Sequence, residues 1–311
     1  MKELSIFEIE RFAIHDGPGI RTTVFFQGCG LRCQWCANPE SQTVGKHIMF
    51  FSKLCTGCGS CAGACHRGAI RMDTDNVCLT DKESTLRKSH MDRSKCVSCG
   101  SCVSACPNGA LKISGQRISP DALFDVIIRD KDYYETSGGG VTVSGGEALL
   151  QIEQMEGFLQ KCHSEHIHIA AETCGYVPIS NIQNAMNNID LFLFDIKTLD
   201  RKRFQTYTGG NLEIVLTAFE YLSNHVPAQV IVRVPVIPGF NDHEIREIME
   251  FVASHGIREI HLLPYHTLGV SKYEQLGLPY SYPVTQGLDS DTLTPYIKVG
   301  EHLNLKVKIG G

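Results

Sequence analysis

Short apolar, β-branched runs alternate with longer stretches of helical periodicity along most of the chain. Runs bounded by turn residues predict strands, and apolar positions that recur every three to four residues predict helices. The predicted strands are residues 21–27, 141–144, 168–172, 191–197, 229–235 and 259–263, and the predicted helices are about residues 149–165, 179–187, 212–224 and 242–254. The last helix follows Asn241 and Asp242, which we expect to cap it. This alternation favours a parallel sheet covered by helices.

A full eight-unit barrel needs more chain than these units supply, so we expect an α/β fold with an open, partial (β/α)6 TIM-like barrel. Residues 46–114 interrupt the pattern and are interpreted as an inserted domain, with 1–45 and 115–311 forming the barrel. In parallel barrels, functional residues gather at the carboxyl ends of the strands. The residues predicted at or near such ends are Cys29, Glu147, Glu172, Asp195, Arg233 and His266.

The composition is that of a globular protein with one unusual component. Of 311 residues, 42% are hydrophobic and 20% are charged, and the net charge of −5 comes without a basic block. We therefore expect no nucleic-acid partner and, without a run of about 18 apolar residues, no membrane partner. The first residues do not resemble a signal peptide, so we expect a cytoplasmic protein. Metal ligation then explains 14 cysteines better than disulfides do.

Two of the three cysteine clusters are copies of each other. Residues 55–70 and 96–111 share the spacing C-x2-C-x2-C-x3-C and are identical at nine of sixteen positions. This is the spacing of bacterial ferredoxins with two [4Fe–4S] clusters, in which the fourth cysteine of each run ligates the other cluster. The expected ligand sets are Cys55, Cys58, Cys61 and Cys106 for one cluster, and Cys96, Cys99, Cys102 and Cys65 for the other. The paired knuckles of structural zinc sites fit this spacing poorly.

The remaining cluster, Cys29-x3-Cys33-x2-Cys36, has only three cysteines. A [4Fe–4S] cube held by three thiolates leaves one iron open to a ligand, and an open position separates a catalytic metal centre from a structural one. The spacing, with the aromatic Trp35 before the last cysteine, resembles the signature of the radical S-adenosylmethionine (SAM) superfamily. A zinc site or a fragment of a third ferredoxin cluster is the alternative.

Further motifs narrow this resemblance. Residues 16–21 read DGPGIR, and residues 141–147 end in a Gly-Gly-Glu that in the superfamily contacts the amino group of SAM. The other matching stretches are residues 25–29, 36–40, 195–197 and 262–269, together with Arg233. Over nearly its whole length the chain resembles the glycyl-radical enzyme activating enzymes. Its insert resembles that of activases of decarboxylases, C–C lyases and dehydratases.

The resemblance implies a fold, an activity and partners. The fold is a partial barrel of the radical SAM type with a ferredoxin-like insert, and the cofactors are three [4Fe–4S] clusters and SAM. The activity is reductive cleavage of SAM, after which the 5′-deoxyadenosyl radical abstracts hydrogen from a backbone glycine of a partner glycyl-radical enzyme. A flavodoxin or ferredoxin is the expected electron donor, with the insert clusters as a relay. We expect a monomer, because the large partner must dock over the barrel mouth.

The resemblance also assigns roles to residues of this chain. Cys29, Cys33 and Cys36 are implied as ligands of the catalytic cluster, and Asp16 as a neighbour of the incoming glycyl loop. The residues implied in SAM binding are Trp35, Cys36, Ala37, Asn38, Gly145, Gly146, Glu147, Asp195, Ile196, Lys197, Arg233 and His266. Lys197 is expected to pair with the SAM carboxylate. A monovalent cation is implied at Glu172, Thr173 and Asp195, although related enzymes often have Asp in place of Glu172.

Taken alone, several of these residues have simpler explanations. Asp195 fits a helix cap, His266 a loop histidine and Arg233 a surface ion pair, and only their convergence on one rim favours a shared site. Cys78, Cys162 and Cys174 lack ligand spacing and are expected to be small buried side chains. Two other functions remain open at this point: a radical SAM enzyme acting on a small molecule, and an electron-transfer iron–sulfur protein with two clusters.

Overall fold

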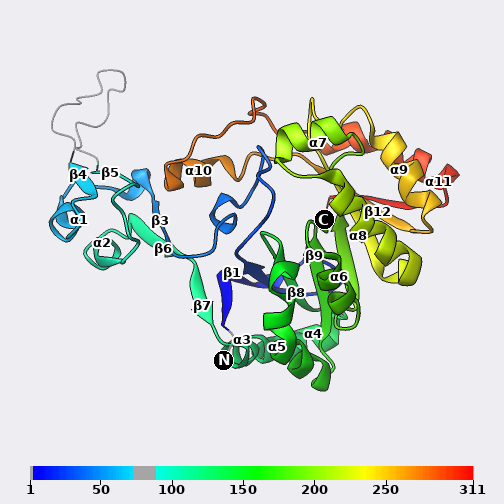
Figure 1. The fold of residues 1–311 in the computed structure, drawn as a ribbon, viewed down its shortest axis with the longest axis horizontal. Helices are drawn as coiled ribbons and strands as arrows, with labels where there is room; N and C mark the ends of the chain where they lie inside the picture. Colours follow the sequence, from blue (N-terminus) through cyan, green and yellow to red (C-terminus); the bar gives the residue numbers. More distant parts are fainter. Residues whose placement is uncertain (1–2, 73–88, 311) are drawn as a thin grey trace.

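The computed structural model describes residues 3–72 and 89–310, and its main element is a nine-stranded sheet (Figure 1). Seven strands run parallel in the order β2 (Arg21–Phe26), β8 (Gly140–Gly145), β9 (His168–Thr173), β10 (Leu191–Asp195), β11 (Val230–Val236), β12 (Glu259–Pro264) and β13 (Lys306–Ile309). β1 (Leu4–Ala13) pairs antiparallel with β2, and β7 (Gln116–Ile118) pairs antiparallel with β1. The six predicted strands are confirmed, and the sheet ends at β13 and β7, so the barrel is open.

Three strands go beyond the predicted set. β1, β7 and β13 extend the sheet on both sides of the six expected strands. Most of their side chains are exposed or half-buried, apart from the first residues and the last residue of β1. Their hydrophobic signal in the sequence is weak for that reason.

Helices connect the parallel strands. The four expected helices correspond to α5 (Ile152–Ser164), α6 (Ile179–Met186), α8 (Leu212–His225) and α9 (Ile245–Ser254). The others in the barrel are α3 (Pro120–Ile127), α4 (Lys131–Ser137), α7 (Arg201–Thr208), α10 (Val270–Leu276) and α11 (Pro295–His302). Short 3-10 turns are η1 (Pro39–Ser41), η2 (Ser52–Leu54), η3 (Ile128–Asp130), η4 (Ala148–Gln151), η5 (Pro227–Gln229) and η6 (Ser290–Leu293). Among the described residues, no helix combines the length and hydropathy that a bilayer crossing requires.

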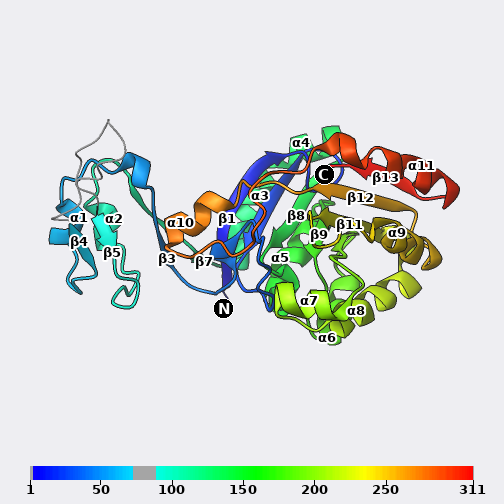
Figure 2. The same cartoon turned by 90° about the horizontal axis from the view of Figure 1, so that it is seen from above.

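The core lies between the sheet and the helices along its outer side (Figure 2). α3, α5, α6, α8 and α9 contribute buried apolar side chains to this core, as amphipathic surface helices do. Phe219 of α8, for example, packs on Phe194 of β10 with ring centroids 5.5 Å apart. Full burial of such a side chain contributes roughly 1.5–3 kcal/mol. A separate apolar cluster of Ala170, Leu191 and Leu193 is formed by strand residues alone.

The start of α9 differs from the expectation. Asn241 and Asp242 do not cap this helix, which begins at Ile245. Asn241 is buried and its side-chain amide donates to the carbonyl oxygens of Lys197 and Pro235, both at 2.7 Å. Its Oδ1 accepts from the backbone N–H of Ile237. The capping prediction is wrong because Asn241 instead joins the ends of two strands.

A small lobe extends from one side of the barrel (Figure 1). Its neck is the antiparallel pair of β3 (His47–Phe50) and β6 (Leu111–Ser114), with His47 opposite Ser114. The neck carries β4 (Ile70–Met72), β5 (Ser89–Met91), α1 (Ser60–Gly63) and α2 (Ser101–Ser104). α1 and α2 occupy equivalent positions of the repeat, and each follows a glycine with positive φ, Gly59 at 78° and Gly100 at 86°. The two copies therefore fold alike.

Candidate active site

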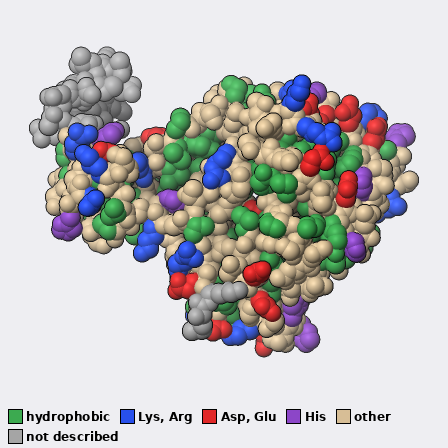
Figure 3. All heavy atoms as spheres, in the orientation of Figure 1, with side chains coloured by type: hydrophobic (Ala, Val, Ile, Leu, Met, Phe, Trp, Pro, Cys, Tyr) green, Lys and Arg blue, Asp and Glu red, His purple; other side chains and the backbone are tan. Residues whose placement is uncertain are grey.

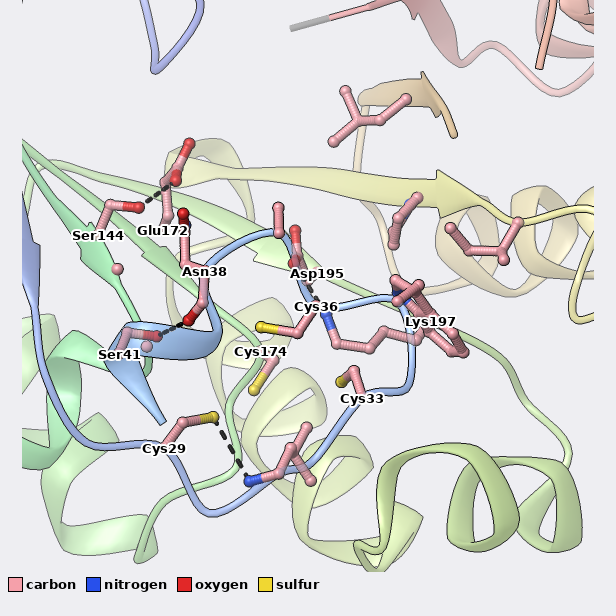
Figure 4. A pocket seen from close by; sticks show the side chains of 18 of the residues that line it. Cys29, Cys33, Cys36, Asn38, Ser41, Ser144, Glu172, Cys174, Asp195 and Lys197 are labelled. Carbon is pink, nitrogen blue, oxygen red and sulfur yellow. Dashed lines mark hydrogen bonds and ion pairs between the residues drawn. The ribbon is translucent and has the colours of Figure 1, made fainter. Parts of the chain in front are cut away.

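A cavity of about 240 Å³ opens at the carboxyl ends of the parallel strands. The loop that follows β2 forms one wall, and residues at the ends of β8 to β12 form the others (Figure 4). The predicted site residues that line it are Cys29, Cys33, Trp35, Cys36, Ala37, Asn38, Gly145, Gly146, Glu172, Thr173, Asp195, Lys197 and His266. The structure therefore brings most of the predicted site to one place, whereas Asp16, Glu147, Ile196 and Arg233 are not part of this lining.

The three predicted ligand cysteines surround this cavity. Figure 4 shows the sulfur atoms of Cys29, Cys33 and Cys36 facing a common space. The backbone N–H of Leu31 donates to Cys29 Sγ at 3.4 Å. Burial raises the pKa of the Cys33 thiol to about 12, with the Lys197 ammonium acting in the opposite direction. Soft thiolates are the ligands that iron–sulfur clusters require, so the donor set fits such a cluster.

A fourth thiol, Cys174, lines the same cavity (Figure 4). It is buried, and its Sγ donates to Glu147 Oε2 at 3.1 Å. A hydrogen bond with Cys29, burial and the Glu147 carboxylate together raise its pKa well above the ordinary value. The expectation of a small buried side chain holds for Cys174 and for Cys162, which lies in the core. Cysteine spacing did not predict that Cys174 lines the cavity, although its position directly after β9 could have indicated this. Cys78 lies outside the described residues.

Lys197 supplies a fixed positive charge to the cavity. Its Nζ lies 3.0 Å from Asp195 Oδ2, and only 11% of the lysine side chain is exposed. Burial lowers the pKa of Lys197, but the neighbouring Asp195 carboxylate acts in the opposite direction, and the pKa is raised overall. The lysine therefore stays protonated and can bind an anionic group such as a carboxylate.

The residues expected to hold a cation are engaged by protein donors. Arg233 Nη1 and Ser144 Oγ both donate to the carboxylate of Glu172. Thr173 Oγ1 donates to Glu147, and Asp195 pairs with Lys197. Burial raises the pKa of Glu172, while the Arg233 guanidinium opposes this shift. In this structure the guanidinium of Arg233 thus provides the positive charge at Glu172. The ion pair of Arg233 lies inside the barrel rather than on the surface, with 14% of the arginine and 20% of the glutamate side chain exposed.

The Gly-Gly-Glu segment joins the end of β8 to the cysteine loop. The backbone N–H of Gly146 donates to Phe26 O at 2.9 Å, and that of Glu147 donates to Gly28 O at 2.8 Å. A Cβ at Gly146 would lie 2.5 Å from Gly28 O, so only glycine permits this approach. The Glu147 carboxylate accepts from Thr173, Cys174 and Leu149 and points away from the cavity. The two glycines, rather than the glutamate side chain, face the cavity.

The DGPGIR loop is pinned to β2 and β8. Thr23 Oγ1 donates to Asp16 Oδ2 at 2.6 Å, and Thr142 Oγ1 donates to the Asp16 carbonyl at 2.7 Å. Arg21 is fully buried and donates to Thr142 Oγ1 and to Val141 O, each at 2.6 Å. Burial lowers the pKa of Arg21 to about 10. Asp16 contributes to the electrostatics of Glu172 and Arg233, so its carboxylate faces the same interior.

Trp35 lines the cavity, and other aromatic side chains pack behind it. Trp35 packs on Phe240 with ring centroids 4.3 Å apart, and Tyr282 lies edge-on at 5.6 Å. On the same loop, Asn38 Oδ1 accepts from Lys272 Nζ of α10 at 2.8 Å, and this ammonium also binds Glu40 at 2.6 Å. Ile196 is buried behind the cavity, whereas His266 lines it with an exposed side chain.

In the small lobe, the structure groups the cysteines in the crossed manner that the repeat predicts. Cys55, Cys58 and Cys61 line one cavity together with Cys106 from the other run. Burial raises the pKa of the Cys102 thiol, and the neighbouring Cys96, Cys65 and Cys99 thiolates raise it further, which places Cys65 with the second run.

Three family models match this chain. Residues 15–60 match a 4Fe-4S single cluster domain, residues 54–110 a 4Fe-4S dicluster domain, and residues 102–252 the radical SAM superfamily. The matches follow the cysteine loop, the small lobe and the parallel strands in chain order. Cys29, Cys33 and Cys36 fall in the first match, and both repeated runs lie within or at the edges of the second.

Relatives match the chain over almost its full length. The trans-4-hydroxy-L-proline dehydratase activating enzyme of Clostridioides difficile is 37% identical over 98% of this chain and 99% of its own. The 4-hydroxyphenylacetate decarboxylase activating enzyme of C. difficile strain 630 is 41% identical, covering 89% of this chain and 86% of its own. The choline trimethylamine-lyase activating enzyme of Oleidesulfovibrio alaskensis is 39% identical, covering 90% and 88%. With these matches and this cavity, the chain belongs to the glycyl-radical enzyme activating enzymes of the radical SAM superfamily, with a ferredoxin-like cluster domain.

Proposed function

We propose that this activase holds its catalytic [4Fe–4S] cluster at Cys29, Cys33 and Cys36 and binds SAM in the cavity between that loop and the strand ends. The observation that carries the proposal is one cavity lined by three thiols, two rim glycines and the Lys197 ammonium. When bound, the reduced cluster and SAM supply the carbon radical that removes hydrogen from a glycine Cα, which no side chain can do.

The protein's own residues bind and orient. Lys197 is a partner for the SAM carboxylate, since it is charged and lines the cavity. Gly145 and Gly146 expose main-chain groups without a Cβ, where the SAM amino group is expected. Trp35 and its aromatic neighbours exclude water from one wall. Asp16, fixed by Thr23, faces the interior that the partner's glycyl loop would enter.

The pair of Arg233 and Glu172 favours a site without a monovalent cation. Glu172 reaches Arg233, and this buried pair already balances the carboxylate charge. We therefore propose that Arg233 does in this chain what a cation at Glu172, Thr173 and Asp195 was expected to do.

The partner is a glycyl-radical enzyme of the kind that the relatives' names describe, such as a dehydratase, decarboxylase or lyase. We further propose that residues 46–114 form the insert, that its two cysteine sets hold two more [4Fe–4S] clusters, and that they relay electrons from a flavodoxin or ferredoxin. The glycyl-radical partner docks over the barrel mouth of a monomeric, cytoplasmic activase.

Iron analysis tests the ligand assignment. Three [4Fe–4S] clusters require about twelve irons per chain, so the reconstituted protein should hold about twelve and Cys36→Ala about eight. Cys162→Ala is the matched control, because this cysteine lies in the core and should leave the iron content unchanged. Equal iron in wild type and Cys36→Ala, or zinc in place of iron, contradicts the assignment.

A further inference from the structure

We infer that the two cysteine sets of the small lobe are not equivalent and that the structure fixes their order. The inner set, Cys96, Cys99, Cys102 and Cys65, lies nearer to the barrel cavity than the outer set, Cys55, Cys58, Cys61 and Cys106. The repeat in the sequence makes the two sets look alike, so only contacts can distinguish them. The order of the two sets is inferred from these contacts alone. The role of this order in electron transfer rests on the proposed function.

The neck defines which end of the lobe faces the barrel. Gln27, just after β2, donates from its side-chain Nε2 to Gly45 O at 2.9 Å. Gly115 packs directly against this hydrogen bond, because a Cβ there would clash with both Gly45 O and Gln27 Nε2. The end of the neck where His47 pairs with Ser114 is therefore the barrel end, and the pair of Phe50 and Leu111 is the far end.

The outer set packs on the far end of this neck. Its cavity is lined by Phe50, Ala110 and Leu111, and by Met72 and Ser89 of the strands beyond. Figures 1 and 2 show α1, which carries Cys61 of the outer set, farther from the barrel than α2, which carries Cys102 of the inner set.

The inner set packs two residues closer to the barrel on each neck strand. On β6, Ile113 packs against Gly100 of the inner run, where a Cβ would lie 2.8 Å from Ile113 Cδ1. On β3, Ile48 O accepts from the guanidinium of Arg93, which precedes the inner run. A displacement of two residues along a strand is about 7 Å.

The helix α10 connects the inner set to the catalytic loop. Arg93, three residues before Cys96, donates to Gln275 O at 2.8 Å, and a Cβ at Gly277 would lie 3.3 Å from Arg93 Nε. Arg93 belongs to the turn that leads directly into the inner set, because the backbone N–H of Cys96 donates to Arg93 O at 3.3 Å.

The other side of α10 reaches the barrel cavity. Gly269, the residue before α10, lies so close to the cysteine loop that a Cβ there would be 2.7 Å from Ala37 Cα. Lys272 holds Asn38 and Glu40 of the cysteine loop. From Lys272 to Gly277 is about 8 Å along the axis of an α-helix. Less than two helical turns thus separate the residue that binds the cysteine loop from the residue that the Arg93 guanidinium contacts.

The loop that leads into the outer set contacts the same helix at its exposed side. Ser52 Oγ, three residues before Cys55, donates to Glu274 Oε1 at 3.0 Å, and this hydrogen bond is exposed. The outer loop itself packs on β4 of the lobe, since a Cβ at Gly59 would contact Met72 at 3.8 Å. The outer set therefore faces the electron donor and the inner set faces the catalytic cavity.

The repeat supplies a matched pair of variants to test this order. Cys58 and Cys99 are equivalent in the two copies and both exposed. In the full-length reconstituted activase with SAM, the microwave power that half-saturates the catalytic cluster's electron paramagnetic resonance signal reports how close another reduced cluster lies. We expect Cys99→Ala to lower this half-saturation power to the value of a variant that lacks both sets. We expect Cys58→Ala to keep most of the wild-type half-saturation power. The opposite ranking, or equal effects, overturns the order.

A second pair of variants keeps all eleven ligand cysteines. Arg93→Ala removes the contacts to Ile48 and Gln275, and should lower the half-saturation power at unchanged iron content. Lys53→Ala, an exposed residue of the outer loop, should not change it. An unchanged signal in Arg93→Ala overturns the inferred link through α10. If both cysteine variants activate the partner as fast as wild type with a protein donor, the proposed relay fails, while the saturation data still decide the order.

Discussion

At the scale of single residues, the site is built from paired charges that the protein largely encloses. Glu172 with Arg233 and Asp195 with Lys197 each place a carboxylate against a cation inside the barrel. Removal of one partner from such a pair leaves the other charge without compensation, which costs far more than the pair itself contributes. The effect of substitution therefore depends on the charge left behind.

Arg233→Ala leaves Glu172 buried without its cation. We expect a loss of about 3 kcal/mol in the free energy of unfolding at neutral pH, measured on the cluster-free chain by denaturant titration. Arg246→Ala, on the exposed face of α9, should change it by less than about 0.5 kcal/mol. Equal effects of the two substitutions would contradict the structural role of the pair.

The same variant has a defined pH dependence. Burial already raises the pKa of Glu172, and loss of Arg233 raises it further. A carboxyl group with a raised pKa in the folded state binds protons more tightly there than in the unfolded chain, so folding is favoured as pH falls. The stability deficit of Arg233→Ala should therefore shrink as pH falls from the raised folded pKa towards the unfolded value of about 4.3. A deficit that grows in this range is the contrary outcome.

Lys197→Met tests the binding role of the ammonium. A charge-assisted hydrogen bond contributes about 1.5–3 kcal/mol, so SAM should bind roughly 10- to 100-fold more weakly by calorimetry under anaerobic conditions. Lys298→Met, on the exposed face of α11, is the control. Unchanged SAM affinity in Lys197→Met, with its iron content intact, would exclude the proposed contact.

At the scale of elements, the close approach of β2 and β8 holds the cysteine loop in place. Gly146→Ala places a Cβ 2.5 Å from Gly28 O, so the strand ends must separate. Gly157 lies within α5 and has only Pro120 Cβ at 4.0 Å. We expect Gly146→Ala to lower both the midpoint of unfolding and SAM affinity, and Gly157→Ala to raise stability by about 0.5–1 kcal/mol without changing affinity. If Gly146→Ala keeps wild-type SAM affinity, the rim does not depend on this approach.

The elements also show how far sequence can predict this fold. The six central strands and four helices follow from buried β-branched runs and helical periodicity, because local pattern and burial agree there. α10 is only seven residues long, and its helix depends on distant partners such as Arg93 and Glu40, which a local pattern does not contain. For the same reason, the sequence did not predict that Cys174 lines the cavity or that the Glu147 side chain turns away from it. A strand end can be predicted from the sequence, but the distant residues that it contacts cannot.

At the scale of the whole molecule, charge is divided between the two lobes. Residues 46–114 contain ten Lys and Arg against five Asp and Glu, while the whole chain has a net charge of −5. Figure 3 shows Lys and Arg side chains spread over the small lobe. A basic lobe on an acidic molecule attracts an acidic protein to one end.

This division predicts the salt dependence of electron delivery. Screening shortens from about 30 Å at 0.01 M to about 8 Å at 0.15 M ionic strength. Reduction by an acidic flavodoxin, followed by stopped-flow absorbance, should therefore slow about tenfold or more over this range. Reduction by a cationic viologen radical should not slow. A flavodoxin rate independent of salt would show that the basic lobe does not guide the donor.

The central claim is that the cavity at Cys29, Cys33 and Cys36 directs radical chemistry at a partner's glycine. The most direct measurement incubates the reduced activase with SAM and its candidate glycyl-radical enzyme without oxygen, and quantifies the glycyl radical by electron paramagnetic resonance together with 5′-deoxyadenosine. The account predicts one 5′-deoxyadenosine per glycyl radical for the wild type, and neither product for Cys36→Ala, which keeps the small lobe's irons. Radical formation by Cys36→Ala, or cleavage of SAM by the wild type without a radical on any glycyl-radical partner, would contradict it.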